Sequence, residues 1–253
     1  AQIFREHQVR IMTAAGDLTR LGLGGSAAGT GMNTHPEYRS KVAQILGELI
    51  GQPLTVAPHL MAAMQSMAPF LNMSGSLRNL AADCVKISHD LRLMDSGPKT
   101  GLKEIQLPPV QPGSSIMPGK YNPVMAEMMS MVSFQVMGYD RSIEMAAQAG
   151  QLELNVMMPL IAYDLIHSIE ILGKAIQALT DEQRCRDYAE GSLALVTALN
   201  THIGYLNAAN VAKESLATGK SLRQIVLEQG LMEPDLLARV LNLEGMSQLP
   251  EKS

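Results

Sequence analysis

Apolar side chains recur at helical spacing along most of this chain. Between Pro36 and Gly51 they fall at positions i, i+3, i+4, i+7 and i+8, which predicts a helix opened by the proline and closed by the glycine. The same spacing predicts helices over residues 1–20, over 59–95 as one long or slightly broken segment, and over about 160–179. No segment shows the convincing alternation of apolar and polar residues that indicates a strand. We therefore expect an all-α fold dominated by long helices.

Residues 96–123 differ from their surroundings because their prolines and glycines are incompatible with a helix. A connection of this length between two helices is uncommon and tends to be functional. From Pro123 to Met137 the pattern predicts a further helix that is apolar nearly all round. A helix without a polar face should be buried among other helices.

Shorter helices are predicted in the last part of the chain. One begins at Ser221 and ends at Gly230, and Pro234 opens the next. We therefore divide the chain into a central helical-bundle domain over residues 1–190 and a small helical C-terminal domain over 191–253.

Composition narrows the classes of function. Hydrophobic residues make up 46% of the 253 residues and charged residues 17%, which supports a sizeable core and argues against disorder. The 18 methionines and the lack of tryptophan indicate closely packed long helices. The net charge of −4, without a long basic run, indicates neither a nucleic-acid partner nor an anionic membrane surface. No apolar segment approaches the roughly 20 residues of a transmembrane helix.

Two further features bear on cofactors and compartment. Cys84 and Cys185 show neither metal-site nor disulfide spacing, so we expect a reducing, cytoplasmic setting and no metal or other cofactor. The small-residue segment from Leu21 to Gly31 contains a Gly-x-Gly spacing, which invites a phosphate-loop interpretation. Because no strand pattern precedes it, a close-packing or turn role is favoured.

The chemistry concentrates between Gly113 and Pro123, with Glu127 just beyond. The segment offers two serine hydroxyls beside a glycine, then Lys120 beside a second glycine, then Asn122 and a helix start. Backbone amides of a glycine-rich turn and the N-terminus of a helix both attract anions. The segment is therefore suited to a small carboxylate with a serine oxygen nearby. The alternative is a surface loop with an incidental lysine.

This run resembles the signature loop of the fumarase/aspartase superfamily, Gly-Ser-Ser-x-Met-Pro-x-Lys-x-Asn-Pro, which it meets without a gap. We call residues 113–123 the signature loop. At the variable position 121 this chain has tyrosine where valine is usual, so the resemblance does not fix the fine geometry of the loop. Further segments that resemble the family are residues 29–38, 90–92 with 96–98, 152–156 and 200–205. The resemblance implies a long-helix bundle of the fumarase/aspartase type with a small helical C-terminal domain.

The resemblance also implies a mechanism. Ser114, as an alkoxide, would remove a proton from the carbon next to a carboxylate, and Ser115 would contact a substrate carboxylate. Lys120 and Asn122 would bind the substrate and stabilise the aci-carboxylate that forms, more strongly than they stabilise the substrate itself. Glu127 would pair with the family's active-site histidine on a neighbouring subunit. Its alternative role is that of a carboxylate favoured by the helix dipole.

The family's histidine motif does not occur in these 253 residues. Thr34-His35 and Thr201-His202 are Thr-His pairs in the wrong surroundings, so we interpret both as decoys. We therefore expect a truncated chain that lacks the histidine and the N-terminal carboxylate contacts and is inactive alone. The resemblance further implies a homotetramer with active sites shared between subunits and a small dicarboxylate as substrate.

The sequence leaves the substrate open between two branches. Gln151 and its neighbours, with Asn122-Pro-Val124, favour elimination of ammonia from L-aspartate to give fumarate, the aspartate ammonia-lyase reaction. Residues 33–38 and 195–205 instead resemble class II fumarate hydratases, which act on L-malate and fumarate. A third alternative is a non-catalytic helical protein like the lens crystallins that resemble this superfamily. The intact Ser114, Lys120 and Asn122 argue against it. We favour the aspartate reaction.

Overall fold

The computed structural model describes residues 2–97, 99–111, 113, 120–180 and 195–242. It divides into two compact units, one made of Ala1–Lys86 and Ser130–Lys174, the other of Ile87–Met129 and Ala175–Ser253. The division into domains at residue 190 stays a prediction. The predicted fold class is confirmed, because the described residues are mostly helical and the longest elements are three helices of 23 to 27 residues.

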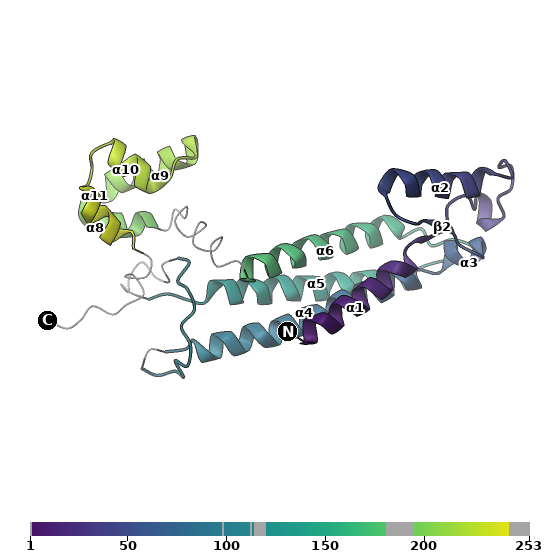
Figure 1. Cartoon of the computed structure of the whole chain (residues 1–253), viewed down its shortest axis with the longest axis horizontal. Coiled ribbons are helices and arrows are strands. Elements are labelled where there is room, and N and C mark those ends of the chain that lie inside the picture. Colours follow the sequence, from purple (N-terminus) through teal and green to yellow (C-terminus); the bar gives the residue numbers. More distant parts are fainter. Residues whose placement is uncertain (1, 98, 112, 114–119, 181–194, 243–253) are drawn as a thin grey trace. The chain divides into compact units, whose positions relative to one another are not determined.

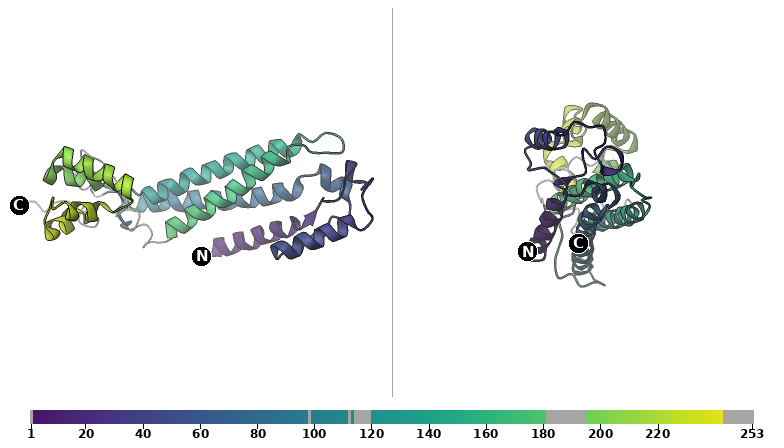
Figure 2. Two further views of the ribbon diagram at one scale, coloured as in Figure 1. Left: turned by 90° about the horizontal axis from the view of Figure 1, so that it is seen from above. Right: turned by 90° about the vertical axis from the view of Figure 1, so that its right-hand side faces the viewer.

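These three helices are α4 (Ala68–Met94), α5 (Val124–Gln148) and α6 (Met158–Thr180), and they run side by side (Figure 1, Figure 2). Helix α1 (Gln2–Asp17) lies along α4. Apolar residues three, four or seven positions apart face inward, as expected for helices that bury one stripe each. In the first unit the buried residues of this bundle include Leu77, Leu80, Ala81, Val136, Ile143, Ile161, Leu165 and Leu172.

The helical segment predicted over 59–95 is broken once. It forms α3 (Leu60–Gln65), then an extended residue at Ser66, and then α4. Pro69 does not interrupt α4, because it lies in the first turn, where its missing N–H is not needed. Gly75 also leaves the helix continuous.

The small-residue segment near residue 25 has a packing role. Gly29 lies in the 3-10 helix η1 (Ala27–Gly29) with φ +83°, and a β-carbon there would come within 2.4 Å of the Met61 backbone nitrogen. Only glycine permits this approach of η1 to α3. The close-packing interpretation is therefore favoured over a phosphate loop.

One pair of short strands was not predicted from the sequence. Strand β1 (Arg20–Leu21) pairs in parallel with β2 (Thr55–Val56), with Arg20 opposite Thr55 and Leu21 opposite Val56. The sequence did not reveal these strands, because two residues are too short to leave an alternating pattern. Helix α2 (Tyr38–Ile50) connects the two strands and ends at Gly51, as predicted. Gly51 adopts the left-handed conformation common at helix ends.

The predicted helix after Pro123 is confirmed and is longer than expected. Within this single chain α5 is not buried all round: Ala126, Met129 and Val136 are buried, but Met131 and Phe134 are 63% and 53% exposed. One apolar face of α5 is therefore open in the isolated chain.

The C-terminal helices have a core of their own. They are α8 (Val196–Ile203), α9 (Tyr205–Thr218), α10 (Leu222–Glu228) and α11 (Pro234–Val240). Ser221 caps α10, as its sequence predicts, by accepting a 3.2 Å hydrogen bond from the Gln224 amide. The cluster they enclose consists of Leu195, Leu199, Ala208, Val211, Leu222, Ile225, Val226, Met232, Leu237 and Leu241. Within the described ranges, no helix is both long and apolar enough to span a bilayer.

Candidate active site

The candidate site lies in the connection between α4 and α5, which belongs to the second unit. Its described residues form no helix or strand, as the sequence predicts. The incoming limb folds back onto the end of α4: the Lys103 amide donates to the Ser96 carbonyl at 2.8 Å, and the Glu104 amide donates to the Met94 carbonyl at 2.8 Å. The connection is therefore attached to the end of α4 at its start.

A second contact closes the base of the signature loop. The Gly113 amide donates to the Lys120 carbonyl at 2.7 Å. A β-carbon on residue 113 would lie 2.8 Å from the Tyr121 α-carbon and 2.9 Å from the Lys120 carbonyl oxygen, so only glycine fits. Ser114 and Ser115, the predicted base and carboxylate contact, lie outside the described residues.

Lys120, whose carbonyl makes this contact, and Asn122 lie directly before α5. The Lys120 residue is exposed and Asn122 is half-buried. The Val124 amide donates to the Asn122 carbonyl at 2.8 Å, and α5 begins directly afterwards. A lysine charge is thus placed within a few residues of a helix N-terminus, where unpaired amides carry partial positive charge. Both features attract an anion.

Glu127 lies in the first turn of α5, where a carboxylate is favoured by the helix dipole. Arg92, in the last turn of α4, reaches it: the guanidinium Nη2 lies 3.4 Å from Glu127 Oε1. Both side chains are more than a third exposed, so this pair contributes little to stability. Arg92 was not predicted as a site residue, and only its position in the Asp90-Leu-Arg92 segment hinted at a role.

Tyr121 turns toward α4. Its hydroxyl donates to Asp95 Oδ1 at 3.1 Å, and the same oxygen accepts the Leu107 amide at 3.0 Å. Burial raises the pKa of Tyr121 to about 12, with a further contribution from the negative charge and the hydrogen bond of Asp95. The phenol therefore remains a protonated donor across the physiological range.

An apolar cavity of about 180 Å³ lies beside these limbs. Its lining includes Leu91, Leu107, Val110, Val124 and Leu179. Such a lining offers no compensation for the charge of a dicarboxylate. The described lining of this cavity is therefore poorly suited to a dicarboxylate.

Three histidines, His7, His35 and His59, hydrogen-bond to other groups of this chain. His35 Nδ1 accepts the Glu37 amide at 3.3 Å, and His59 Nδ1 accepts the Ala62 amide at 3.3 Å at the start of α3. His7 is buried on α1, with Nε2 2.6 Å from Asp83 Oδ2. Among the described residues, no group of three or more His, Cys, Asp or Glu could hold a metal ion.

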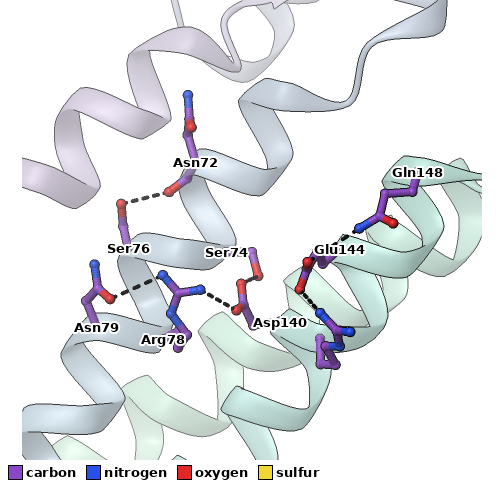
Figure 3. A network of polar contacts seen from close by, with 9 residues as sticks. Asn72, Ser74, Ser76, Arg78, Asn79, Asp140, Glu144 and Gln148 are labelled. Atoms are coloured by element: carbon purple, nitrogen blue, oxygen red, sulfur yellow. Dashed lines mark hydrogen bonds and ion pairs between the residues drawn. The ribbon is translucent and has the colours of Figure 1, made fainter.

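Sequence reasoning also missed a buried polar network in the first unit (Figure 3). Asp140 on α5 accepts the Ser74 hydroxyl at 2.6 Å and pairs with Arg78 Nη1 at 3.0 Å, both residues of α4. Asp140 is 6% exposed. The only sequence signal was a charged residue on an otherwise apolar helix face.

Comparisons with known proteins agree with this arrangement. A family model described as "Lyase" matches residues 1–138, and one described as "Fumarase C C-terminus" matches residues 195–248. An aspartate ammonia-lyase of Helicobacter pylori is 44% identical over 246 residues, covering 94% of this chain and 53% of that enzyme. A class II fumarate hydratase of Neisseria meningitidis is 46% identical over 232 residues, covering 88% of this chain and 50% of that enzyme.

Solved structures show the same relationship. The class II fumarase of Schistosoma mansoni superposes with a TM-score of 0.69 at 31% identity, covering 96% of this chain and 56% of that one. A fumarate lyase:delta crystallin of Brucella melitensis, bound to cobalt, superposes with a TM-score of 0.68 at 38% identity, covering 98% of this chain and 56% of that one. This chain belongs to the fumarase/aspartase family of lyases. It spans about half the length of the curated relatives it matches.

Proposed function

We propose that the enzyme to which these residues belong eliminates ammonia from L-aspartate to give fumarate. The observation that carries this proposal is the signature loop, whose pattern is complete from Gly113 to Pro123 and whose base is closed by the contact between Gly113 and Lys120. Similarity to aspartate ammonia-lyases over more than nine-tenths of the chain supports the choice of substrate.

In the proposed reaction, the Ser114 oxygen, ionised as an alkoxide, takes a proton from the carbon next to one carboxylate of aspartate. The electron pair of that C–H bond moves into the carboxylate, which becomes a doubly negative aci-carboxylate. The double bond of fumarate then forms as the neighbouring C–N bond breaks and ammonia leaves. The proton goes to Ser114, the electron pair of the C–H bond ends in the new double bond, and the electron pair of the C–N bond leaves with ammonia. No oxidant or reductant is needed.

Electrostatics decides whether this path is feasible. A serine hydroxyl is a weak base and the aci-carboxylate carries an extra charge, so both need a strongly electropositive site. Lys120, which is exposed and precedes the start of α5 by four residues, supports such a site. Asn122 would donate a hydrogen bond to the same carboxylate, and Ser115 would hold it in place. These contacts strengthen as charge develops, which is what lowers the barrier.

Two parts of the proposal concern groups outside these residues. Glu127 would pair with a histidine from a neighbouring subunit, and Arg92 already holds one oxygen of that carboxylate. The open apolar side chains of α5 and α6, Met131, Phe134, Met145, Tyr163, Ile166 and Ile169, support burial against other subunits in a homotetramer. A reducing, cytoplasmic setting fits the buried free thiol of Cys84.

A second candidate is hydration of fumarate to L-malate. It is favoured by the 46% identity to the Neisseria fumarate hydratase and by the fumarase-like segments at residues 33–38 and 195–205. Gln151, which favours the aspartate branch, lies in the turn between α5 and α6, where its backbone pairs with Leu154 at 3.1 and 3.3 Å. Gln151 therefore serves as a marker of the aspartate branch, and we assign it no contact with the leaving group.

The experiment follows fumarate absorbance in the complete enzyme, with L-aspartate and L-malate supplied separately. A site that hydrogen-bonds an ammonium leaves partners unpaired with a hydroxyl, so we expect the aspartate rate to exceed the malate rate by roughly a hundredfold or more. Fumarate formed from malate and not from aspartate would transfer the proposal to the second candidate.

A companion experiment uses the 253-residue chain alone. We propose that it has no measurable activity with either substrate, since the matched relatives are about twice as long and the catalytic histidine is expected outside these residues. Turnover by the isolated chain would show that the partners of Glu127 have been misplaced.

A further inference from the structure

Asp95 joins three parts of the chain that meet at the end of α4. It follows the last turn of the helix, where its amide donates to the Leu91 carbonyl at 3.0 Å. Its Oδ1 accepts the Leu107 amide of the incoming limb at 3.0 Å and the Tyr121 hydroxyl of the outgoing limb at 3.1 Å. One carboxylate oxygen therefore connects the helix to both limbs of the connection.

The contact of Tyr121 lies next to functionally important positions. Tyr121 stands between Lys120 and Asn122, and the Lys120 carbonyl accepts the Gly113 amide at 2.7 Å. Lys120 and Tyr121 share a peptide bond. The hydrogen bond from Tyr121 to Asp95 therefore also restrains the base of the signature loop.

The hydroxyl of Tyr121 is a well-defined donor. Its half-buried ring leaves the phenol with one polar atom that needs a partner. The raised pKa, about 12, keeps the proton on the phenol at neutral pH. The distance of 3.1 Å is long for an O–H···O contact, so the effect of removing it should be moderate rather than large.

We propose that Asp95 and Tyr121 are positioning residues that fix the outgoing limb, with Lys120 and Asn122, against the end of α4. The catalytic part of this inference rests on the proposed function of the signature loop. Its physical part, the anchoring of the limb, does not. The two parts are therefore tested by separate measurements on the complete enzyme.

Hydrogen exchange of two amides tests the anchoring. Tyr121→Phe removes only the hydroxyl, so the limb loosens and the Gly113 amide, bonded to the Lys120 carbonyl, should exchange roughly 3- to 10-fold faster. The Leu107 amide, bonded directly to Asp95, should be unchanged. Asp95→Ala removes the shared acceptor and should accelerate both amides. Tyr205→Phe, on an exposed tyrosine of α9, is the matched control and should change neither.

Kinetics tests the consequence for catalysis. Tyr121→Phe should lower kcat/KM by roughly 3- to 10-fold, the range for one ordinary hydrogen bond, with kcat falling as well as KM rising because Lys120 acts on the transition state. Asp95→Asn keeps an acceptor oxygen and should retain more activity than Asp95→Ala. A merely structural role would lower the melting temperature and leave the kcat of the folded enzyme unchanged.

Each outcome has one meaning. Faster exchange at Gly113 with lower kcat in Tyr121→Phe supports the proposal, and unchanged exchange at Gly113 overturns it whatever the activity. If Tyr121→Phe exchanges faster at Gly113 but keeps the kinetics of an active wild-type enzyme, the positioning role is wrong. If the complete wild-type enzyme turns over neither aspartate nor malate, the proposed function is wrong, and faster Gly113 exchange in Tyr121→Phe still supports the anchoring.

Discussion

The buried network around Asp140 allows a stability prediction that does not depend on function. Asp140→Ala removes the carboxylate that Ser74 and Arg78 of α4 share on α5. The Ser74 hydroxyl donates at 2.6 Å to a charged acceptor and is itself buried, so losing its partner should cost about 1.5–3 kcal/mol. The Arg78 side chain is 49% exposed and can turn to water, so its share is about 0.5–1 kcal/mol. We expect a total of about 2–4 kcal/mol.

The assay is equilibrium urea unfolding at one fixed protomer concentration, because the apparent stability of an oligomer depends on concentration. Glu144→Ala is the matched control: it removes an exposed ion pair with Arg141, 2.5 Å long, about one turn along the same helix (Figure 3). We expect it to cost no more than about 0.5 kcal/mol. A double-mutant cycle of Ser74→Ala and Asp140→Ala should give a coupling energy above about 1 kcal/mol. If Asp140→Ala matched Glu144→Ala, the network would contribute nothing measurable and the reasoning would be refuted.

Three further predictions concern the site and the thiol. In the complete enzyme, Ser114→Ala should reduce kcat by several orders of magnitude with much less effect on substrate binding. Lys120→Ala should reduce both kcat and substrate binding. A Ser114→Ala rate above a tenth of wild type would show that another group removes the proton. Arg92→Gln should change the free energy of unfolding by less than about 1 kcal/mol, because its ion pair with Glu127 is exposed and 3.4 Å long. It should nevertheless lower kcat if Glu127 acts in catalysis. Arg92→Lys should retain part of that kcat. Burial and then the charge of Asp83 raise the pKa of Cys84 from 9.0 to about 11, so the folded state holds this proton more tightly than the unfolded chain. The stability this gives is complete below pH 9 and is lost as the pH rises toward 11, and iodoacetamide at pH 8 should label Cys84 only in urea, as checked by peptide mapping.

The sequence alone determined which long segments are helical and that the connection between α4 and α5 is not. Helical periodicity located α2, α5 and α6 because each buries one stripe of apolar residues, and that requirement is written into a single segment. Pro36, Gly51 and Ser221 marked starts and stops through local backbone chemistry. The irregular connection over residues 96–123 was predictable for the same reason, since its prolines and glycines exclude a helix by themselves.

Contacts between distant residues were decided only by the tertiary structure. Asp140 meets Ser74 across 66 positions, and Tyr121 meets Asp95 across 26, and no local pattern specifies either partner. The parallel pairing of β1 with β2 is of the same kind, because each strand is too short to signal itself. Even Gly113 was recognisable only as part of a motif, whereas the approach of the Tyr121 α-carbon explains why no larger residue fits. Local periodicity records what one helix must bury, but which side chains meet depends on how the helices are aligned against one another.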